Sequence, residues 1–124
     1  MAKRILWLSQ HRPLAVQIKR LEGRFGGDVV VEVDSDTFTN AEELVGRFRR
    51  DGYDDWVVVA PLSVIGRMCE LAGELGLPKP LMANMEQLQS AKKAEADLVY
   101  RGRIYKFVGF RRVKRLILEY GEEF

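Results

Sequence analysis

The chain alternates between short apolar runs and segments in which apolar residues recur every three or four positions. Four apolar runs are typical of strands: residues 5–8, 29–33, 56–60 and 80–85. Three periodic segments between them predict amphipathic helices: residues 13–26, 39–52 and 61–76. The first helix is expected to follow Pro13, and Thr39 or Asn40 is expected to cap the second. This order repeats a strand–helix unit three times and then adds a strand.

Such an order predicts an α/β fold with a parallel sheet, because right-handed crossover connections place helices on both faces of a sheet. The run at 5–8 is apolar throughout, which favours a central strand buried on both faces. We therefore expect a small Rossmann-like sheet of about four strands in the order second, first, third, fourth. Cys69 falls on the apolar side of the third helix and is expected in the core.

The last third of the chain has a different pattern. Residues 86–96 are polar and predict a loop. Residues 96–101 and 103–110 read as a hairpin around Gly102, and residues 113–120 fit either a further strand or a terminal helix. The expected organisation is one Rossmann-like domain over 1–124, in which 96–124 form a β-rich appendage.

Composition limits the class of protein. Hydrophobic residues make up 47% of the chain, which predicts a folded globular domain. No apolar run approaches the roughly 20 residues that span a bilayer, and no signal peptide is recognisable, so a cytoplasmic location without membrane contact is expected. One cysteine and one histidine cannot make an internal disulfide or a Cys/His zinc site, and we expect neither metal nor cofactor.

Charge is nearly balanced overall, at +2, but it is uneven along the chain. Residues 98–120 include one acid, Glu119, and seven basic residues: Arg101, Arg103, Lys106, Arg111, Arg112, Lys114 and Arg115. Interleaved aromatic residues make a nucleic-acid platform conceivable, although a half-exposed sheet has the same pattern. The second interpretation is favoured, and little generic nucleic-acid binding is expected.

Polar residues gather where the predicted sheet would bind a ligand. In open α/β sheets ligands lie beyond the carboxyl ends of the strands, where the winding direction changes, here between the first and third strands. The loops at this point are residues 9–12 (Ser9, Gln10, His11 and Arg12) and residues 61–63, while Asn84 and Glu86 end the neighbouring fourth strand and residues 34–37 end the second. Helix N-termini at this edge would add amide donors for a small anion.

Each of these residues also has a plainer interpretation. Ser9 and Gln10 could cap the first helix, Ser63 could cap the third, and His11 could be an ordinary surface histidine. Asp34 and Asp36 form a carboxylate pair, yet acids in a turn are usually solvated, so a metal role is the less favoured interpretation. The phosphate-binding motifs G-x-G-x-x-G and G-x-x-x-x-G-K-[ST] are absent, which disfavours the usual dinucleotide and P-loop sites.

The segments "RILWLSQH" and "VVVAPLSVIG", followed by a small β-rich appendage, resemble the minimal CARF-type proteins of CRISPR systems, which include small ring nucleases. The resemblance covers roughly the first 85 residues. It implies a homodimer that binds cyclic oligoadenylate on its two-fold axis and cleaves it. Such cleavage would control antiviral signalling. The implied contacts are Ser9, Gln10, His11, Arg12, Leu62, Ser63 and Asn84.

Cleavage in that family is similar to metal-independent ribonuclease chemistry, in which a ribose 2′-hydroxyl attacks the adjacent phosphodiester. On this interpretation His11 is a general acid or a phosphate donor, and Arg12 neutralises charge. Ser9, Gln10 and Ser63 would orient phosphate and ribose. The alternative is a module without catalysis, which senses a nucleotide or binds nucleic acid through the basic C-terminal region.

Overall fold

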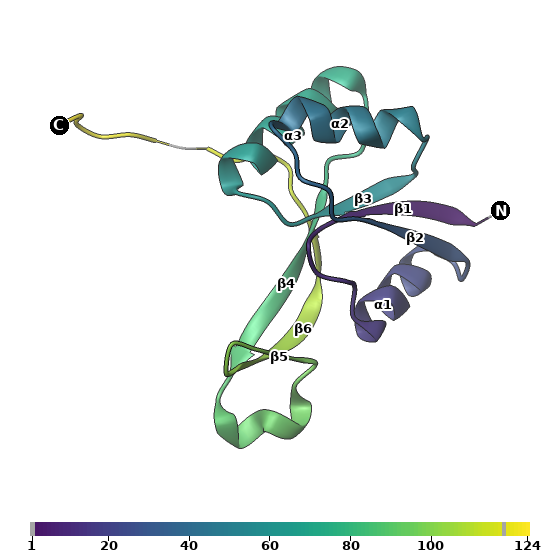
Figure 1. The fold of residues 1–124 in the computed structure, drawn as a ribbon, viewed down its shortest axis with the longest axis vertical. Helices are drawn as coiled ribbons and strands as arrows, with labels where there is room; N and C mark the ends of the chain where they lie inside the picture. Colours follow the sequence, from purple (N-terminus) through teal and green to yellow (C-terminus); the bar gives the residue numbers. More distant parts are fainter. Residues whose placement is uncertain (1, 118) are drawn as a thin grey trace.

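The computed structural model describes residues 2–117 and 119–124, and within them it contains one six-stranded sheet flanked by three α-helices (Figure 1). The elements follow in the order β1 (Lys3–Leu8), α1 (Ala15–Phe25), β2 (Val29–Asp34), α2 (Ala41–Arg50), β3 (Asp55–Val58), α3 (Leu62–Leu75), β4 (Leu81–Leu88), the 3₁₀ helix η1 (Ser90–Glu95), β5 (Leu98–Tyr100) and β6 (Arg103–Arg112). The predicted α/β class is confirmed.

The sheet has the order β2-β1-β3-β4-β6-β5. Its first four strands are parallel, which confirms the predicted order, and β6 pairs antiparallel with both β4 and β5. β4 meets β3 only near its start, where Val57 is opposite Leu81, while β6 pairs with β4 from Leu81 to Leu88. The C-terminal hairpin therefore continues the sheet beyond the carboxyl ends of β1 and β3.

Alternation along β1 and β3 divides the core into two clusters, one on each face of the sheet. Leu6 and Trp56 face α2 and α3, while Ile5 and Trp7 face α1, and all four side chains are buried. Figure 1 shows α2 and α3 on one side of the sheet and α1 on the other. β1 is apolar from Ile5 onwards and β3 from Trp56 onwards, because both faces of these strands are covered.

The helix ends follow local chemistry. Asn40 caps α2, with its side-chain oxygen accepting from the Glu43 amide at 2.9 Å, as one of the two predicted caps. Gly26 and Gly76 end α1 and α3 in the left-handed conformation, with φ of 81° and 67°, which glycine adopts without strain.

Three predicted caps are wrong, because the helices begin later or earlier than the polar residues. α1 begins after Leu14, so Ser9 and Gln10 lie too far upstream to cap it. α3 begins after Pro61, so Ser63 lies inside its first turn.

Cys69 is buried on α3, as expected, and this burial raises the pKa of its thiol.

Two predictions for the C-terminal third are also wrong. Residues 86–96 are not a loop: β4 extends to Leu88 because β6 supplies backbone partners along its whole length, and η1 follows. In the described part of residues 113–120 the chain is neither strand nor helix, and residue 118 lies outside the described residues. Val113 and Leu116 pack against the α2/α3 cluster, so burial rather than backbone pairing accounts for their apolar character.

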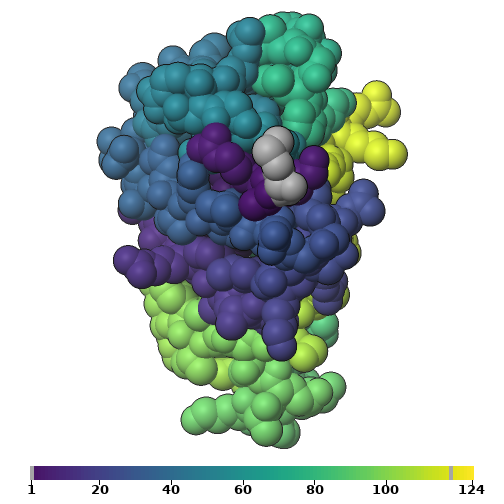
Figure 2. Space-filling view, turned by 90° about the vertical axis from the view of Figure 1, so that its right-hand side faces the viewer, coloured from purple at the N-terminus to yellow at the C-terminus, as the bar shows by residue number. Residues whose placement is uncertain are grey.

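The C-terminal hairpin projects from the body of the molecule. In Figure 1 the β4–β6 pair runs away from β1 and β3 towards η1, and Figure 2 shows the green C-terminal segments at the lower end of the molecule, below the purple and blue N-terminal half. No helix in the described part of the chain is long and apolar enough to cross a membrane.

Candidate functional site

A cavity of about 360 Å³ lies at the carboxyl ends of the parallel strands, and we call it the switch-point cavity. It opens between the β1–α1 connection, the end of β3, the first half of β4 and the C-terminal hairpin. Its lining residues are Trp7, Ser9, His11, Arg12, Leu14, Gln17, Val58, Val59, Ala60, Met82, Ala83, Met85, Leu98, Tyr100 and Tyr105. This is the crevice at which doubly wound sheets bind ligands.

Hydrogen bonds fix the chain between β1 and α1. The indole nitrogen of Trp7 donates to the carbonyl of His11 at 2.9 Å, and the amide of His11 donates to Ser9 Oγ at 3.0 Å. Ser9 is itself 5% exposed, whereas His11 and Arg12 are exposed. The imidazole of His11 packs edge-on against Tyr100, with ring centres 5.3 Å apart. The loop thus presents a histidine and an arginine at the rim of the cavity.

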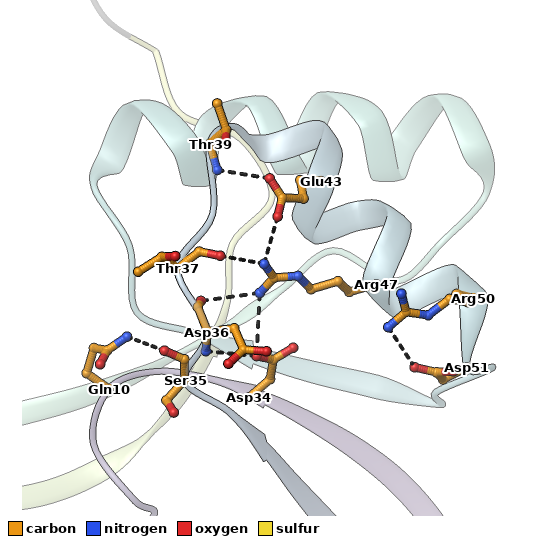
Figure 3. Close-up of polar contacts among 10 residues, drawn as sticks. All are labelled: Gln10, Asp34, Ser35, Asp36, Thr37, Thr39, Glu43, Arg47, Arg50 and Asp51. Atoms are coloured by element: carbon orange, nitrogen blue, oxygen red, sulfur yellow. Dashed lines mark hydrogen bonds and ion pairs between the residues drawn. The ribbon is translucent and has the colours of Figure 1, made fainter.

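Gln10 points the other way, towards the end of β2. Its side-chain amide donates to the carbonyl of Ser35 (Figure 3). It lines a second, small cavity together with Ser9, Asp34 and Asp36. The fold therefore places Ser9, His11 and Arg12 in the wall of the switch-point cavity, whereas the side chain of Gln10 lies outside it.

The turn that contains Asp34 and Asp36 is bound by an arginine side chain of the same chain. Arg47 on α2 lies 3.4 Å from Asp34 Oδ1, and it donates to the carbonyl of Thr37 at 2.6 Å and to Glu43 at 2.8 Å (Figure 3). Its side chain is only 13% exposed. The carboxylate of Asp34 is thus compensated by an arginine that ties this turn to α2.

The remaining predicted contacts, Leu62, Ser63 and Asn84, do not line the switch-point cavity. Leu62 is 56% exposed on the first turn of α3, and Ser63 beside it is exposed. Asn84 lies within β4 opposite Gly109, at an irregularity in the pairing with β6, rather than at the end of a short strand. From β4, the cavity wall takes Met82, Ala83 and Met85 instead.

Several lining residues had no place in the predicted site, among them Gln17, Tyr100 and Tyr105. The tyrosines lie on the hairpin, and only the pairing of β6 with β4 brings them to the crevice. Gln17 could have been found from the sequence, because it lies three residues after Leu14 and four before Leu21, on the apolar face of α1. A polar side chain at a core position indicates a buried hydrogen-bonding role.

The lining combines aromatic walls with positive charge. Trp7, Tyr100 and Tyr105 contribute flat apolar surface, and Arg12 and His11 are cationic or proton-donating groups. No aspartate or glutamate occurs among the described residues that line the cavity. The arrangement suits a ligand that has a planar body and carries negative charge or hydrogen-bond acceptors.

The basic C-terminal residues serve different purposes. The guanidinium of Arg112 forms a two-pronged ion pair with the buried carboxylate of Asp55, with distances of 2.7 and 2.8 Å, and this hydrogen bonding raises the pKa of Arg112. Arg101 stacks on the ring of Tyr100, 5.2 Å from its centre, beside the cavity. Arg112 therefore belongs to the fold, whereas Arg101 lies against one of the tyrosines of the cavity wall.

Comparisons of the chain with protein-family models, with curated proteins and with solved structures found no match. Function is therefore inferred from the chemistry of the cavity and from its position in the sheet.

Proposed function

We propose that this protein is a ring nuclease, which binds cyclic oligoadenylate at the switch-point cavity and cleaves it without a metal ion. The observation that carries the proposal is the composition of the cavity wall: aromatic surface, Arg12 and His11, and no carboxylate among its described lining residues. A nucleotide combines a flat aromatic base with an anionic phosphate, and both of these parts have a counterpart in such a wall.

The size of the cavity supports one nucleotide per protomer. Ligand pockets span roughly 300 to 1,000 Å³, and at about 360 Å³ this one is near the small end. In the proposed complex the base lies against Trp7 and the tyrosines, and the phosphate lies at the rim near His11 and Arg12. A cyclic oligonucleotide is larger than this space, so two cavities from two copies of the chain would share it.

The proposed reaction is an internal transesterification. The ribose 2′-oxygen attacks the adjacent phosphorus as its proton passes to solvent water, the bond from phosphorus to the 5′-oxygen breaks, and the 5′-oxygen gains a proton. The products end in a 2′,3′-cyclic phosphate and a 5′-hydroxyl. His11 would protonate the leaving 5′-oxygen, and Arg12 would stabilise the charge on the phosphorane.

The test is incubation with a panel of cyclic oligoadenylates and cyclic dinucleotides in EDTA, followed by mass analysis. We expect linear oligoadenylates with 2′,3′-cyclic phosphate ends, because the reaction needs only positioning and proton transfer. Binding with no cleavage would favour the sensing module over the enzyme. A chain that binds none of these nucleotides would contradict both.

A further inference from the structure

Gln17 and Ser9 are the buried polar residues in the wall of the switch-point cavity, and the geometry of Gln17 makes its side chain a hydrogen-bond donor towards the cavity. It lies on the first turns of α1 and is 5% exposed. Its side-chain oxygen accepts from the backbone amide of Leu14 at 2.7 Å. That bond satisfies the first amide at the start of the helix, which would otherwise be unpaired.

The bond to Leu14 determines which way the carboxamide points. A backbone amide needs an acceptor, so the oxygen of Gln17 must face Leu14 and its NH₂ group must face away. In the described residues, the one partner of this NH₂ group is the thioether of Met85 at 3.8 Å. A thioether is a weak acceptor, and Met85 also lines the cavity.

A buried amide donor with so weak a partner carries an energetic penalty that a ligand can remove. An unsatisfied buried donor loses its hydrogen bonds to water without gaining protein ones. Gln17 and Met85 line the same cavity as Trp7, whose own donor is already used by the carbonyl of His11. The apolar part of the wall thus contains a donor held in one orientation.

We infer that Gln17 is a specificity residue, whose NH₂ group donates to an acceptor atom on the edge of a flat aromatic heterocycle bound in this cavity. This inference rests on the proposed function because it takes the switch-point cavity as the ligand site. It adds which part of the ligand Gln17 recognises. A ring nitrogen or ring carbonyl oxygen fulfils the requirement, and a hydrocarbon ring of the same shape does not. For an adenine nucleotide the acceptor would be one of the ring nitrogens.

The experiment compares 2-naphthoate with its quinolinecarboxylate isosteres, which replace one ring carbon by nitrogen at different positions. All are flat and anionic, and they differ in the acceptor alone. We expect at least one quinolinecarboxylate to bind about five- to tenfold more tightly than 2-naphthoate, as measured by NMR titration, because that is the worth of one ordinary hydrogen bond.

The decisive variant is Gln17→Glu. It keeps an oxygen for the Leu14 amide, so α1 should begin as before, but it replaces the NH₂ group by an oxygen that repels a ring nitrogen. The preference for the quinolinecarboxylate should disappear. Gln89→Glu is the matched control, since Gln89 is exposed just after β4 and does not line the switch-point cavity, and it should keep the preference. Thermal unfolding of each variant confirms folding.

Two outcomes would overturn the inference: the Gln17→Glu protein keeps the preference, or the parent binds none of these acids more tightly than 2-naphthoate. Cyclic oligoadenylate is titrated in parallel. If the parent discriminates among the acids but binds no cyclic oligoadenylate, the proposed function fails and the role of Gln17 stands. If cyclic oligoadenylate is cleaved and Gln17→Glu changes neither its binding nor the preference among the acids, the proposed function stands and the role of Gln17 is wrong.

Discussion

His11 is held by its backbone while its ring remains exposed. Its amide and carbonyl are both hydrogen-bonded, to Ser9 and Trp7, and its imidazole contacts Tyr100. The position of the ring is therefore set by the loop, and removal of the side chain should leave the loop in place. This separation allows a chemical role to be tested without disturbing the fold.

We predict that His11→Ala lowers cleavage of cyclic oligoadenylate by about 10²-fold or more while affinity changes little. The magnitude is that of general acid–base assistance, and binding is maintained by the aromatic wall and Arg12. Single-turnover rates and dissociation constants measure the two effects separately. Lys19→Ala, at an exposed position on α1, is the control. Cleavage by the His11→Ala protein at the parent rate would disprove the proposed proton transfer.

Glu32 on β2 provides a prediction for the dependence of stability on pH. Hydrogen bonds from Tyr53 and Arg4 lower its pKa from 4.5, and its contact with Arg4 is 3.0 Å long. A carboxylate with a lowered pKa in the folded state stabilises the protein above its unfolded pKa, and this contribution is lost as the pH falls through the folded pKa.

We therefore expect Glu32→Gln to lower the melting temperature by a constant amount between neutral pH and about pH 5. Below about pH 4.5 the difference from the parent should shrink, because the parent also loses the charge. Thermal unfolding across this pH range provides the measurement. A difference that grows as the solution becomes more acidic would contradict the assignment.

Single residues also mark the limit of what the sequence predicts. The loop of Ser9, His11 and Arg12 lies at the edge of the cavity, and a strand end followed by polar residues is enough to predict that location in a doubly wound sheet. The sequence places Gln10 between them, but the orientation of its side chain depends on the carbonyl of Ser35, which lies 25 residues later. Such a long-range partner leaves no local pattern.

At the scale of elements, the parallel half was predictable and the hairpin was only partly so. Apolar runs and glycine ends define β1, β3 and the helices locally. The length of β4 was not predictable in this way, since its polar second half is a strand only because β6 pairs with it. The tyrosine wall of the cavity depends on that same pairing, so the sequence predicts only the side of the cavity that the β1–α1 connection forms.

Arg112 and Asp55 join the two halves of the sheet, and we predict an asymmetric cost of breaking their ion pair. Arg112→Ala should lower the free energy of unfolding by about 2–4 kcal/mol, since it leaves a buried carboxylate without a cation. Asp55→Ala should cost less, because Arg112 is 36% exposed and still donates to the carbonyl of Lys79 at 2.8 Å.

Denaturant unfolding of both single variants and the double variant measures this asymmetry. The double variant should be more stable than Arg112→Ala alone, because removing Asp55 removes the unpaired charge. If Arg112→Ala costs less than Asp55→Ala, the buried carboxylate is not the source of the penalty.

At the scale of the whole molecule, exposed apolar side chains lie in and beside the wall of the switch-point cavity. Val59 and Tyr100, which line the cavity, are 55% and 40% exposed, and Leu62 at the start of α3 is 56% exposed. Apolar groups around the mouth of a site that is too small for the proposed ligand are suited to contact a second copy of the chain.

We predict a homodimer in which two switch-point cavities face each other and share one cyclic oligoadenylate. Leu62→Glu should convert the dimer to a monomer and lower cleavage with it, because a buried charge at the interface is costly while Leu62 lies outside the cavity wall. Leu75→Glu is the matched control: it places the same charge at an exposed leucine on the other end of α3, and it should leave both mass and activity unchanged. Light scattering gives the mass, and the same samples give the cleavage rate. A parent protein that is monomeric with and without cyclic oligoadenylate, yet cleaves it, would show that one cavity suffices.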